Sequence, residues 1–201
     1  MKVKGYMGKK LTTYTADDIE ILEDLTPILH RPGMYTDPVN PNHALVEVID
    51  NASDEGLAGY AKNVEITIYE DGSAEVVDDG RGIPIDIHKT KKIPAIQVIF
   101  TTLHSGGKFR KTDSESVYRI AGGLHGVGVC VSNALSSKLE AEVKRDGALY
   151  QITFGPNGKI KTPLKKHKKL PSSKTGTRIR FWPDPKYFDS VKFDISELTA
   201  L

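Results

Sequence analysis

Segments that alternate apolar and polar residues, joined by short glycine turns, constrain the fold of this chain most strongly. Residues 64–69 and 74–78 flank a Glu70-Asp71-Gly72 turn, which is typical of a β-hairpin. Further strand candidates follow at 139–144, 149–154 and 177–182, with Asp-Gly and Asn-Gly turns at 146–147 and 157–158. We therefore expect a sheet whose neighbouring strands run mostly antiparallel.

Helical periodicity occupies most of the remaining sequence. A helix pair is predicted over 17–31, with Thr26 as the N-cap before Pro27. A long helix is predicted from Pro41 to about Ala61, closed by glycines, and others at 94–104 and 126–136. The turn at 31–35 lies between elements. So does the lysine-rich span 159–169, for which a solvated edge or loop is favoured over a binding patch. We predict an α/β (α+β) two-layer sandwich, with a mixed, mostly antiparallel sheet and helices on one face.

Composition narrows the class of protein. The 201 residues are 38% hydrophobic and 27% charged, with a net charge of +2, which suits one globular domain and argues against a dedicated nucleic-acid footprint. A single cysteine excludes an internal disulfide, and neither a zinc pattern nor a membrane-spanning run is found. We expect a flexible arm at 1–13, one domain at 14–201 that belongs to a longer protein, and a cytosolic location.

The helix centred on residues 47–55 gathers polar groups on one side. Glu47, Asn51, Asp54 and Glu55 fall within an arc of roughly 100° at helical spacing. A carboxylate and a carboxamide one turn apart can act on the same water or hydrated metal ion. The alternative is an ordinary solvated face of an amphipathic helix.

Two glycine-rich segments favour a ligand site. Asp78-Asp79-Gly80-Arg81-Gly82-Ile83-Pro84 follows a strand, where glycines let a planar ligand approach the backbone and an aspartate can accept from an amine. Gly122-Gly123-Leu124-His125-Gly126-Val127-Gly128 leads into a helix and exposes backbone N–H groups suited to phosphate. The long glycine-rich span 105–124 is typical of a lid. Taken singly, each could be a turn or a surface loop.

The order of these segments, followed by Lys174-Thr175-Gly176-Thr177, resembles the GHKL ATPases. Arg-Pro-Gly-Met-Tyr at 31–35, the 122–128 loop and Arg-Phe-Trp-Pro-Asp at 180–184 are similar to the B subunits of bacterial type II topoisomerases. Residues 35–43 look closer to the topoisomerase IV branch than to the gyrase branch.

The resemblance implies a role for each matching residue. Glu47 would be the general base that activates the water, Asn51 would bind Mg²⁺, and Asp78 would accept from the adenine amine beside Thr177. Glu55 and Arg81 would form an ion pair flanking the adenine pocket, with Asp54 structural. Further nucleotide contacts are implied for Gly82, Ile83, Pro84, Lys108, Tyr118, Gly122, Gly123, Leu124, His125, Gly126, Val127 and Gly128. Tyr14 would reach the nucleotide of a partner protomer.

Apolar lining is implied for Val48, Val76 and Ile179, and Arg145 would lie at the mouth of the pocket, where aminocoumarins bind. The implied inhibitor pocket consists of Val48, Asn51, Asp78, Arg81, Pro84, Arg145 and Thr177. The charged loop at 109–118 is longer than the family pattern, which leaves the geometry of the lid open.

The resemblance implies ATP and Mg²⁺ as cofactors and an ATP-dependent bacterial cytoplasmic enzyme that drives DNA strand passage, decatenation and relaxation. Its partners would be the topoisomerase IV A protein in a heterotetramer, a second copy in an ATP-dependent dimer, DNA, and ATP-competitive or aminocoumarin-type inhibitors, but no membrane. Because the family draws a phosphate-binding lysine from a following domain, little turnover is expected from this chain alone. Alternatives are the equivalent gyrase domain, which would drive negative supercoiling, a nucleotide-gated dimerisation module, or a histidine-kinase catalytic domain.

Overall fold

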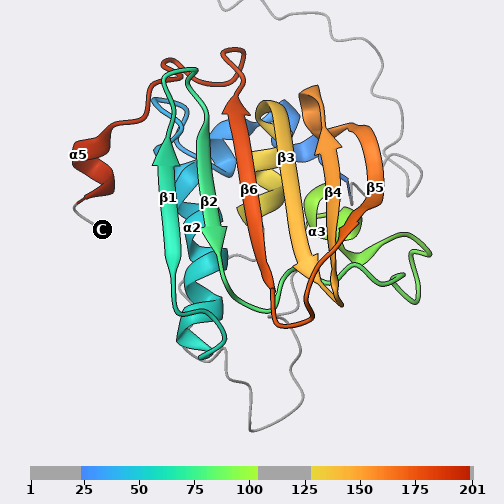
Figure 1. Cartoon of the computed structure of the whole chain (residues 1–201). Helices are drawn as coiled ribbons and strands as arrows, with labels where there is room; N and C mark the ends of the chain where they lie inside the picture. The colour runs from blue at the N-terminus through green and yellow to red at the C-terminus, as the bar shows by residue number, and fades with distance from the viewer. Residues whose placement is uncertain (1–23, 104–127, 200–201) are drawn as a thin grey trace, which may run out of the picture.

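Six strands form a single sheet in the order β1-β2-β6-β3-β4-β5 in this computed structural model, which describes residues 24–103 and 128–199 (Figure 1). The strands are β1 (Val64–Ile68), β2 (Ala74–Asp78), β3 (Ser136–Arg145), β4 (Ala148–Phe154), β5 (Ile160–Lys169) and β6 (Gly176–Pro183). Each pair of neighbouring strands among them is antiparallel. The predicted mostly antiparallel sheet is confirmed, and no parallel pair occurs within the described ranges.

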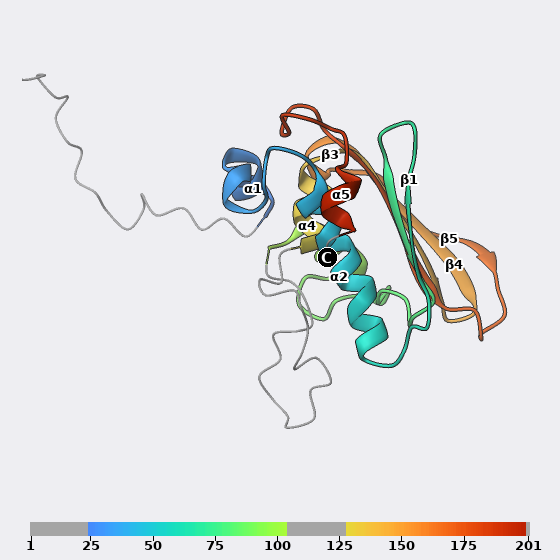
Figure 2. The same ribbon diagram turned by 90° about the vertical axis from the view of Figure 1, so that its left-hand side faces the viewer.

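The helices cover one face of this sheet (Figure 2). They are α1 (Thr26–His30), α2 (Asn42–Leu57), α3 (Ala95–Thr101), α4 (Gly128–Ala134) and α5 (Ile195–Leu198). Short 3-10 helices occupy Pro32–Met34 and Pro156–Gly158. The predicted two-layer sandwich is therefore confirmed. None of the described helices is long and apolar enough to cross a membrane.

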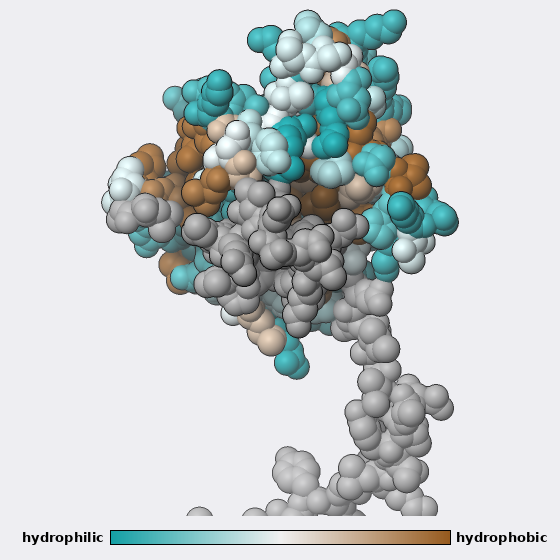
Figure 3. All heavy atoms as spheres, turned by 90° about the horizontal axis from the view of Figure 1, so that it is seen from below, coloured by the Kyte–Doolittle hydropathy of each residue, from teal (hydrophilic) through white to brown (hydrophobic). Residues whose placement is uncertain are grey.

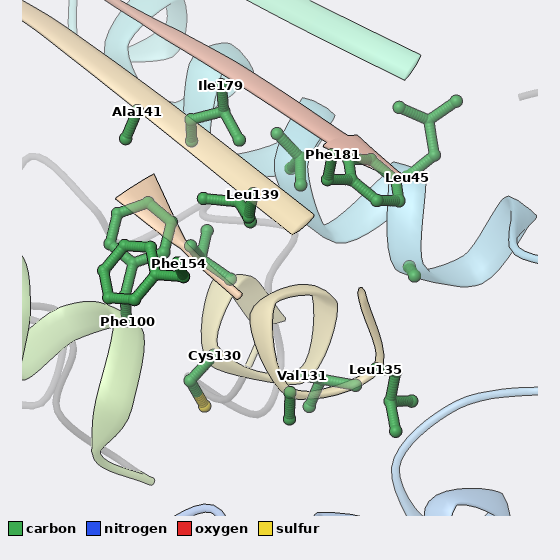
Figure 4. Packing of buried hydrophobic residues seen from close by; sticks show 14 of the residues in the cluster. Leu45, Phe100, Cys130, Val131, Leu135, Leu139, Ala141, Phe154, Ile179 and Phe181 are labelled. Atoms are coloured by element: carbon green, nitrogen blue, oxygen red, sulfur yellow. The ribbon is translucent and has the colours of Figure 1, made fainter. Parts of the chain in front are cut away.

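The hydrophobic core lies between the two layers (Figure 4). Burial alternates along β2 and β6 because successive side chains of a strand point to opposite faces. Phe100 of α3 stacks on Phe154 of β4, with ring centroids 5.2 Å apart. Leu139, Ile179 and Phe181 bring the inner faces of β3 and β6 into the same core. Helix α2 packs against β1 and β2, and α4 packs against β3 and β6.

The opposite, open face of the sheet carries paired charges. Arg178 of β6 lies 2.6 Å from Glu75 of β2, and within 3.8 Å of Glu140 and 3.4 Å of Glu142, both on β3. Gln151 of β4 donates to Glu142 at 2.7 Å. These cross-strand pairs leave the acids of this face already engaged.

The N-terminus of α2 is attached to the C-terminal segment. Asn42 is 6% exposed, and its amide donates to the Asp194 carbonyl at 2.8 Å and to the Glu197 carboxylate at 2.7 Å. The Asn42 side-chain oxygen accepts from the Asp194 N–H at 2.9 Å. Residues about 150 positions apart therefore hold the N-terminal turn of α2 against the C-terminal segment.

Three local predictions need correction. The N-cap of α1 is Leu25 rather than Thr26, and the Asp24 carboxylate instead accepts from the Thr26 N–H and hydroxyl. Helix α2 ends at Leu57 instead of about Ala61, since Gly59 adopts φ 77° and Tyr60 N–H bonds back to the Glu55 carbonyl. The span at 159–169 is a solvated edge, as predicted, but it forms the ten-residue strand β5, which was not predicted.

Candidate nucleotide site

Helix α2 places Glu47, Asn51 and Glu55 on successive turns, over about 12 Å of helix axis. All three are partly buried, and Asp54 beside them is only 4% exposed. This side of the helix is therefore not fully exposed to solvent. The burial of Asp54 agrees with a structural role for that residue.

Glu47 lies against the first residue of α4. A Cβ at Gly128 would collide with Glu47 Oε2 and come within 2.9 Å of the Glu47 Cβ, so only glycine fits this approach. Cys130, two residues further along α4, is buried. Its burial raises the pKa of its thiol to about 12, and the nearby Glu47 charge adds to this rise. The thiol therefore stays protonated at neutral pH.

Asp78 ends β2 directly opposite Thr177 of β6. Its Oδ1 accepts from Gly80 N–H at 2.9 Å and from Thr177 N–H at 3.3 Å, and no hydrogen bond reaches Oδ2 from the described part of the chain. Burial raises the pKa of Asp78, as do the charges of Glu55 and Asp79, while the two N–H donors oppose the rise. One carboxyl oxygen is fixed by the backbone, which leaves the other to accept from a ligand.

The first residue of β6 must be glycine for Asp78 and Thr177 to lie opposite each other. Gly176 has a φ of 134°, and a Cβ there would collide with the Asp78 carbonyl oxygen. The next residue, Thr177, is 7% exposed, and its hydroxyl accepts from Ile83 N–H at 3.3 Å. The close approach of the two strands thus connects Asp78 to the segment that follows it.

That segment turns at Gly82, whose φ is 78° and favours glycine. A Cβ at Gly82 would come within 2.9 Å of the Lys144 carbonyl oxygen. The Arg145 guanidinium donates to the Gly82 carbonyl at 2.7 Å. Arg145, predicted at the mouth of the pocket, therefore bonds to the backbone of Gly82, which was predicted as part of the pocket wall. Pro84, two residues later, is exposed.

The predicted ion pair between Glu55 and Arg81 is present. Arg81 donates to Glu55 through its backbone N–H at 3.0 Å, its Nε at 3.0 Å and an Nη at 2.6 Å. The guanidinium also lies 3.7 Å from the centre of the Tyr60 ring, close enough for a cation–π interaction. The C-terminal turn of α2 is thereby attached to the segment after β2.

Asp79 and Tyr60 were not assigned roles from the sequence. Asp79 accepts from the backbone N–H groups of Lys62 and Asn63 and from the Asn63 amide. The Asn63 N–H, the Asn63 amide and the Lys62 N–H together lower the pKa of Asp79 to about 2. In the sequence, Asp79 is visible only as the second aspartate at the end of a strand, and Tyr60 only as an aromatic residue after Gly59. Neither pattern predicts which residue Asp79 or Tyr60 contacts.

The apolar residues predicted as pocket lining belong to the core. Val48, Val76 and Ile179 are 1%, 3% and 4% exposed, and Val76 pairs with Ile179 across β2 and β6. Seen from below, hydrophilic residues gather along the upper edge of the view, and hydrophobic ones lie nearer the middle (Figure 3). Contact of Val48, Val76 and Ile179 with a ligand stays a prediction.

The other predicted contacts lie outside the described residues: Tyr14, Lys108, Tyr118, Gly122, Gly123, Leu124, His125, Gly126 and Val127. Within residues 24–103 and 128–199, no group of three or more His, Cys, Asp or Glu could hold a metal ion. A Mg²⁺ ion bound mainly by nucleotide phosphates needs only one or two protein oxygens, and the partly buried Asn51 fits that requirement.

Residues 36–187 match the family of histidine kinase-, DNA gyrase B- and HSP90-like ATPases. The chain is 50% identical over 188 residues to the DNA topoisomerase 4 B subunit of Pseudomonas aeruginosa, covering 94% of this chain and 29% of that protein. It is 47% identical over 189 residues to the DNA gyrase B subunit of Haloferax volcanii, covering 92% of this chain and 29% of that protein. The chain thus spans under a third of the length of these relatives.

Solved structures agree with these matches. The topoisomerase IV ATP-binding domain of Francisella tularensis, in complex with a small-molecule inhibitor, is 48% identical with a TM-score of 0.77, over 90% of this chain and 46% of that one. The 43K ATPase domain of Thermus thermophilus gyrase B, in complex with an aminocoumarin, is 40% identical with a TM-score of 0.74, over 88% of this chain and 43% of that one. The chain therefore belongs to the family of histidine kinase-, DNA gyrase B- and HSP90-like ATPases.

Proposed function

We propose that this chain is the ATP-binding and ATP-hydrolysing domain of a topoisomerase IV B subunit. The observation that carries the proposal is Asp78, a buried carboxyl at a strand end with one oxygen fixed by backbone N–H groups. Adenine presents an amino group where guanine presents a carbonyl oxygen. An acceptor at Asp78 therefore favours adenine and repels guanine. Identities of about 50% to topoisomerase IV B subunits support the branch.

Each of the remaining site residues has a chemical role in this proposal. Glu47, which α4 approaches closely at Gly128, would orient and deprotonate the water that attacks the γ-phosphate. Asn51 would supply an oxygen to Mg²⁺, an ion that neutralises phosphate charge when bound. The ion pair of Glu55 with Arg81 would keep the backbone at 80–82 in place beside the base. The 122–128 loop and Lys108 would contact the phosphates.

In the full-length protein, this domain would drive ATP-dependent strand passage together with the topoisomerase IV A protein, in the bacterial cytosol. Dimerisation through the N-terminal arm and inhibition by aminocoumarin-type compounds belong to the same proposal. The 47% identity to a gyrase B protein supports a second candidate, the equivalent gyrase domain. Decatenation by the holoenzyme favours the first candidate, and negative supercoiling favours the second.

A thermal unfolding experiment on the 201-residue chain tests nucleotide binding. A non-hydrolysable ATP analogue with Mg²⁺ should raise the Tm, because a ligand that binds only the native state stabilises it by about 2.7 kcal/mol at 100 times its Kd. The matching GTP analogue should give no shift. Equal shifts with both analogues, or none with either, would contradict the proposal.

The base assignment has its own test in the full-length protein. Glu47→Gln should lower ATP turnover by about 100-fold or more, as expected for loss of a general base, while analogue affinity stays within a few fold. Asp50→Asn on the same helix is the matched control and should keep turnover. Normal hydrolysis in Glu47→Gln would exclude Glu47 as the base.

A further inference from the structure

The edge strand β5 and the residue before it carry charge of one sign only. Residues 159–169 include six lysines and one histidine and contain no acid. Every lysine in this span is exposed. Without these six lysines, the 28 basic residues of the chain fall to 22 against 26 acidic ones, a net charge of −4 elsewhere. The overall charge of +2 therefore hides a strongly basic edge on an otherwise acidic chain.

The lysines project to both faces of the sheet along a free edge. Among the described strands, β5 is the last in the order and pairs only with β4 (Figure 1). Lys165 lies opposite Gln151 and Lys168 opposite Leu149, whereas Lys166 lies opposite Tyr150. Opposed residues share a face, and Gln151 bonds to Glu142 on the open face. Lys165 and Lys168 therefore lie on the open face, and Lys166 lies on the other.

Nothing in the described structure neutralises this edge. None of the six lysines forms an ion pair with a residue of 24–103 or 128–199. The neighbouring strand β4 contains no acid. Glu140 and Glu142, on the open face of β3, are engaged by Arg178, and Glu140 also by Lys138. Asp146, in the turn between β3 and β4, lies 3.6 Å from Arg145. The edge thus keeps its positive charge available to a partner.

Protection against edge-to-edge pairing does not account for so much charge. Charged side chains, a proline and a bulge are separate means of blunting an edge strand. Strand β5 already has Pro163 at an exposed position and three register shifts against β4. Six like charges also repel one another, which costs stability unless a polyanion compensates.

We propose that the β5 edge, defined by Lys159, Lys161, Lys165, Lys166, Lys168 and Lys169, docks against the phosphate backbone of duplex DNA. The inference rests on the proposed function, which gives the full-length protein DNA as its substrate. A ten-residue strand extends roughly 33 Å, close to one turn of duplex, about 34–36 Å. Lysines on an exposed edge meet phosphates as point charges and read no bases, so the contact has no sequence preference.

The test measures binding of the 201-residue chain to a fluorescent 30-base-pair duplex by anisotropy, at several salt concentrations. Lys165→Glu/Lys168→Glu keeps the edge charged, and so protected, but reverses the sign of two contacts. This variant should bind at least about tenfold more weakly at low salt, and its log–log salt slope should be smaller by about 2. The control Lys89→Glu/Lys192→Glu makes the same change in net charge at exposed lysines elsewhere and should bind like the parent.

The proposal would be overturned by any of these results: no salt-dependent binding by the parent, equal weakening in the control, or preference for a polyglutamate peptide over the duplex. Self-association of the β5 variant with unchanged DNA affinity would identify edge protection as the whole role. Thermal stabilisation by the ATP analogue, measured on the same samples, should be unchanged in both variants. Absence of thermal stabilisation in the parent would contradict the proposed function. The DNA proposal would then be decided by the anisotropy results alone.

Discussion

Asp71 and Asp78 lie at opposite ends of β2 and differ in every respect that matters for function. Asp71, exposed in the hairpin turn, accepts from Ser73, Arg180 and Trp182. The Ser73 hydroxyl, followed by the Ser73 N–H, Trp182 and Arg180, lowers the pKa of Asp71 to about 2. Asp78 is buried, has only backbone donors on one oxygen, and has a raised pKa.

Asp71 is therefore a structural acid, whereas Asp78 is suited to binding a ligand. All the partners of Asp71 come from the fold, so the folded chain itself stabilises its charge. At Asp78 the fold removes water, supplies no cation, and leaves one oxygen as an acceptor. Such an arrangement costs stability, and a ligand that donates to the second oxygen would offset the cost.

The largest expected difference between the two ends concerns glycine. Gly176→Ala puts a side chain at φ 134° and into the Asp78 carbonyl, which should lower the free energy of unfolding by about 3 kcal/mol or more. Gly72→Ala also meets a positive φ, 78°, but in open space, and should cost about 1–2 kcal/mol. Urea denaturation measures both, and equal losses would contradict the tight strand approach at Asp78.

Two arginines, one near each end of β2, make matching contacts and should contribute equally to stability. Arg180 lies 3.7 Å from the Tyr69 ring and binds Asp71, and Arg81 lies 3.7 Å from the Tyr60 ring and binds Glu55. Replacing either with alanine should cost about 1–2 kcal/mol of stability.

Their effects on nucleotide should diverge. Arg81→Ala removes the positive charge beside Glu55, which lies near Asp78, and should weaken an ATP analogue about tenfold, in the range of a lost charged contact. Arg180→Ala should leave analogue affinity unchanged and serves as the control in calorimetry. Equal weakening by both variants would show that the two ends are not functionally distinct.

The smallest effect is a difference in pH dependence. Lowered pKa values at Asp71 and Asp79 contribute stability that is present above their ordinary pKa of 3.8 and is lost as pH falls towards 2. The raised pKa of Asp78 acts in the opposite direction, since the folded state binds more protons and stability falls as pH rises above 3.8. Asp78→Asn should remove that fall, so its stability relative to the parent should increase with pH and then level off. A constant difference would contradict the raised pKa.

Local patterns predicted most of the fold, and tertiary pairing decided the rest. Strand β2 and the start of α2 follow from alternation and from Pro41, since both signals are local. The strand at 160–169 could not be predicted, because its lysines favour solvent and only pairing with β4 makes it a strand. Thr26 is the first residue of α1 rather than its N-cap, and its N–H and hydroxyl both donate to the Asp24 carboxylate.

In the site, too, some contacts could be predicted from the sequence and others depend on the tertiary structure. The pair of Glu55 with Arg81 was predictable from the family resemblance, whereas Tyr60 under the guanidinium depends on how α2 ends. The bonds from Lys62 and Asn63 to Asp79 connect two loops that no sequence spacing relates. The position of Thr177 opposite Asp78 requires the order of strands in the sheet.

Calorimetric titration of Asp78→Asn with a non-hydrolysable ATP analogue and Mg²⁺ tests the role of Asp78 as the adenine acceptor most directly. The amide keeps the acceptor for Gly80 and Thr177 but places a donor where the adenine amine would donate. We expect affinity to fall about 100-fold, or about 2.7 kcal/mol, with the Tm unchanged or raised, whereas Asp71→Asn should lower the Tm and keep affinity. Unchanged affinity in folded Asp78→Asn would exclude Asp78 as the group that binds adenine.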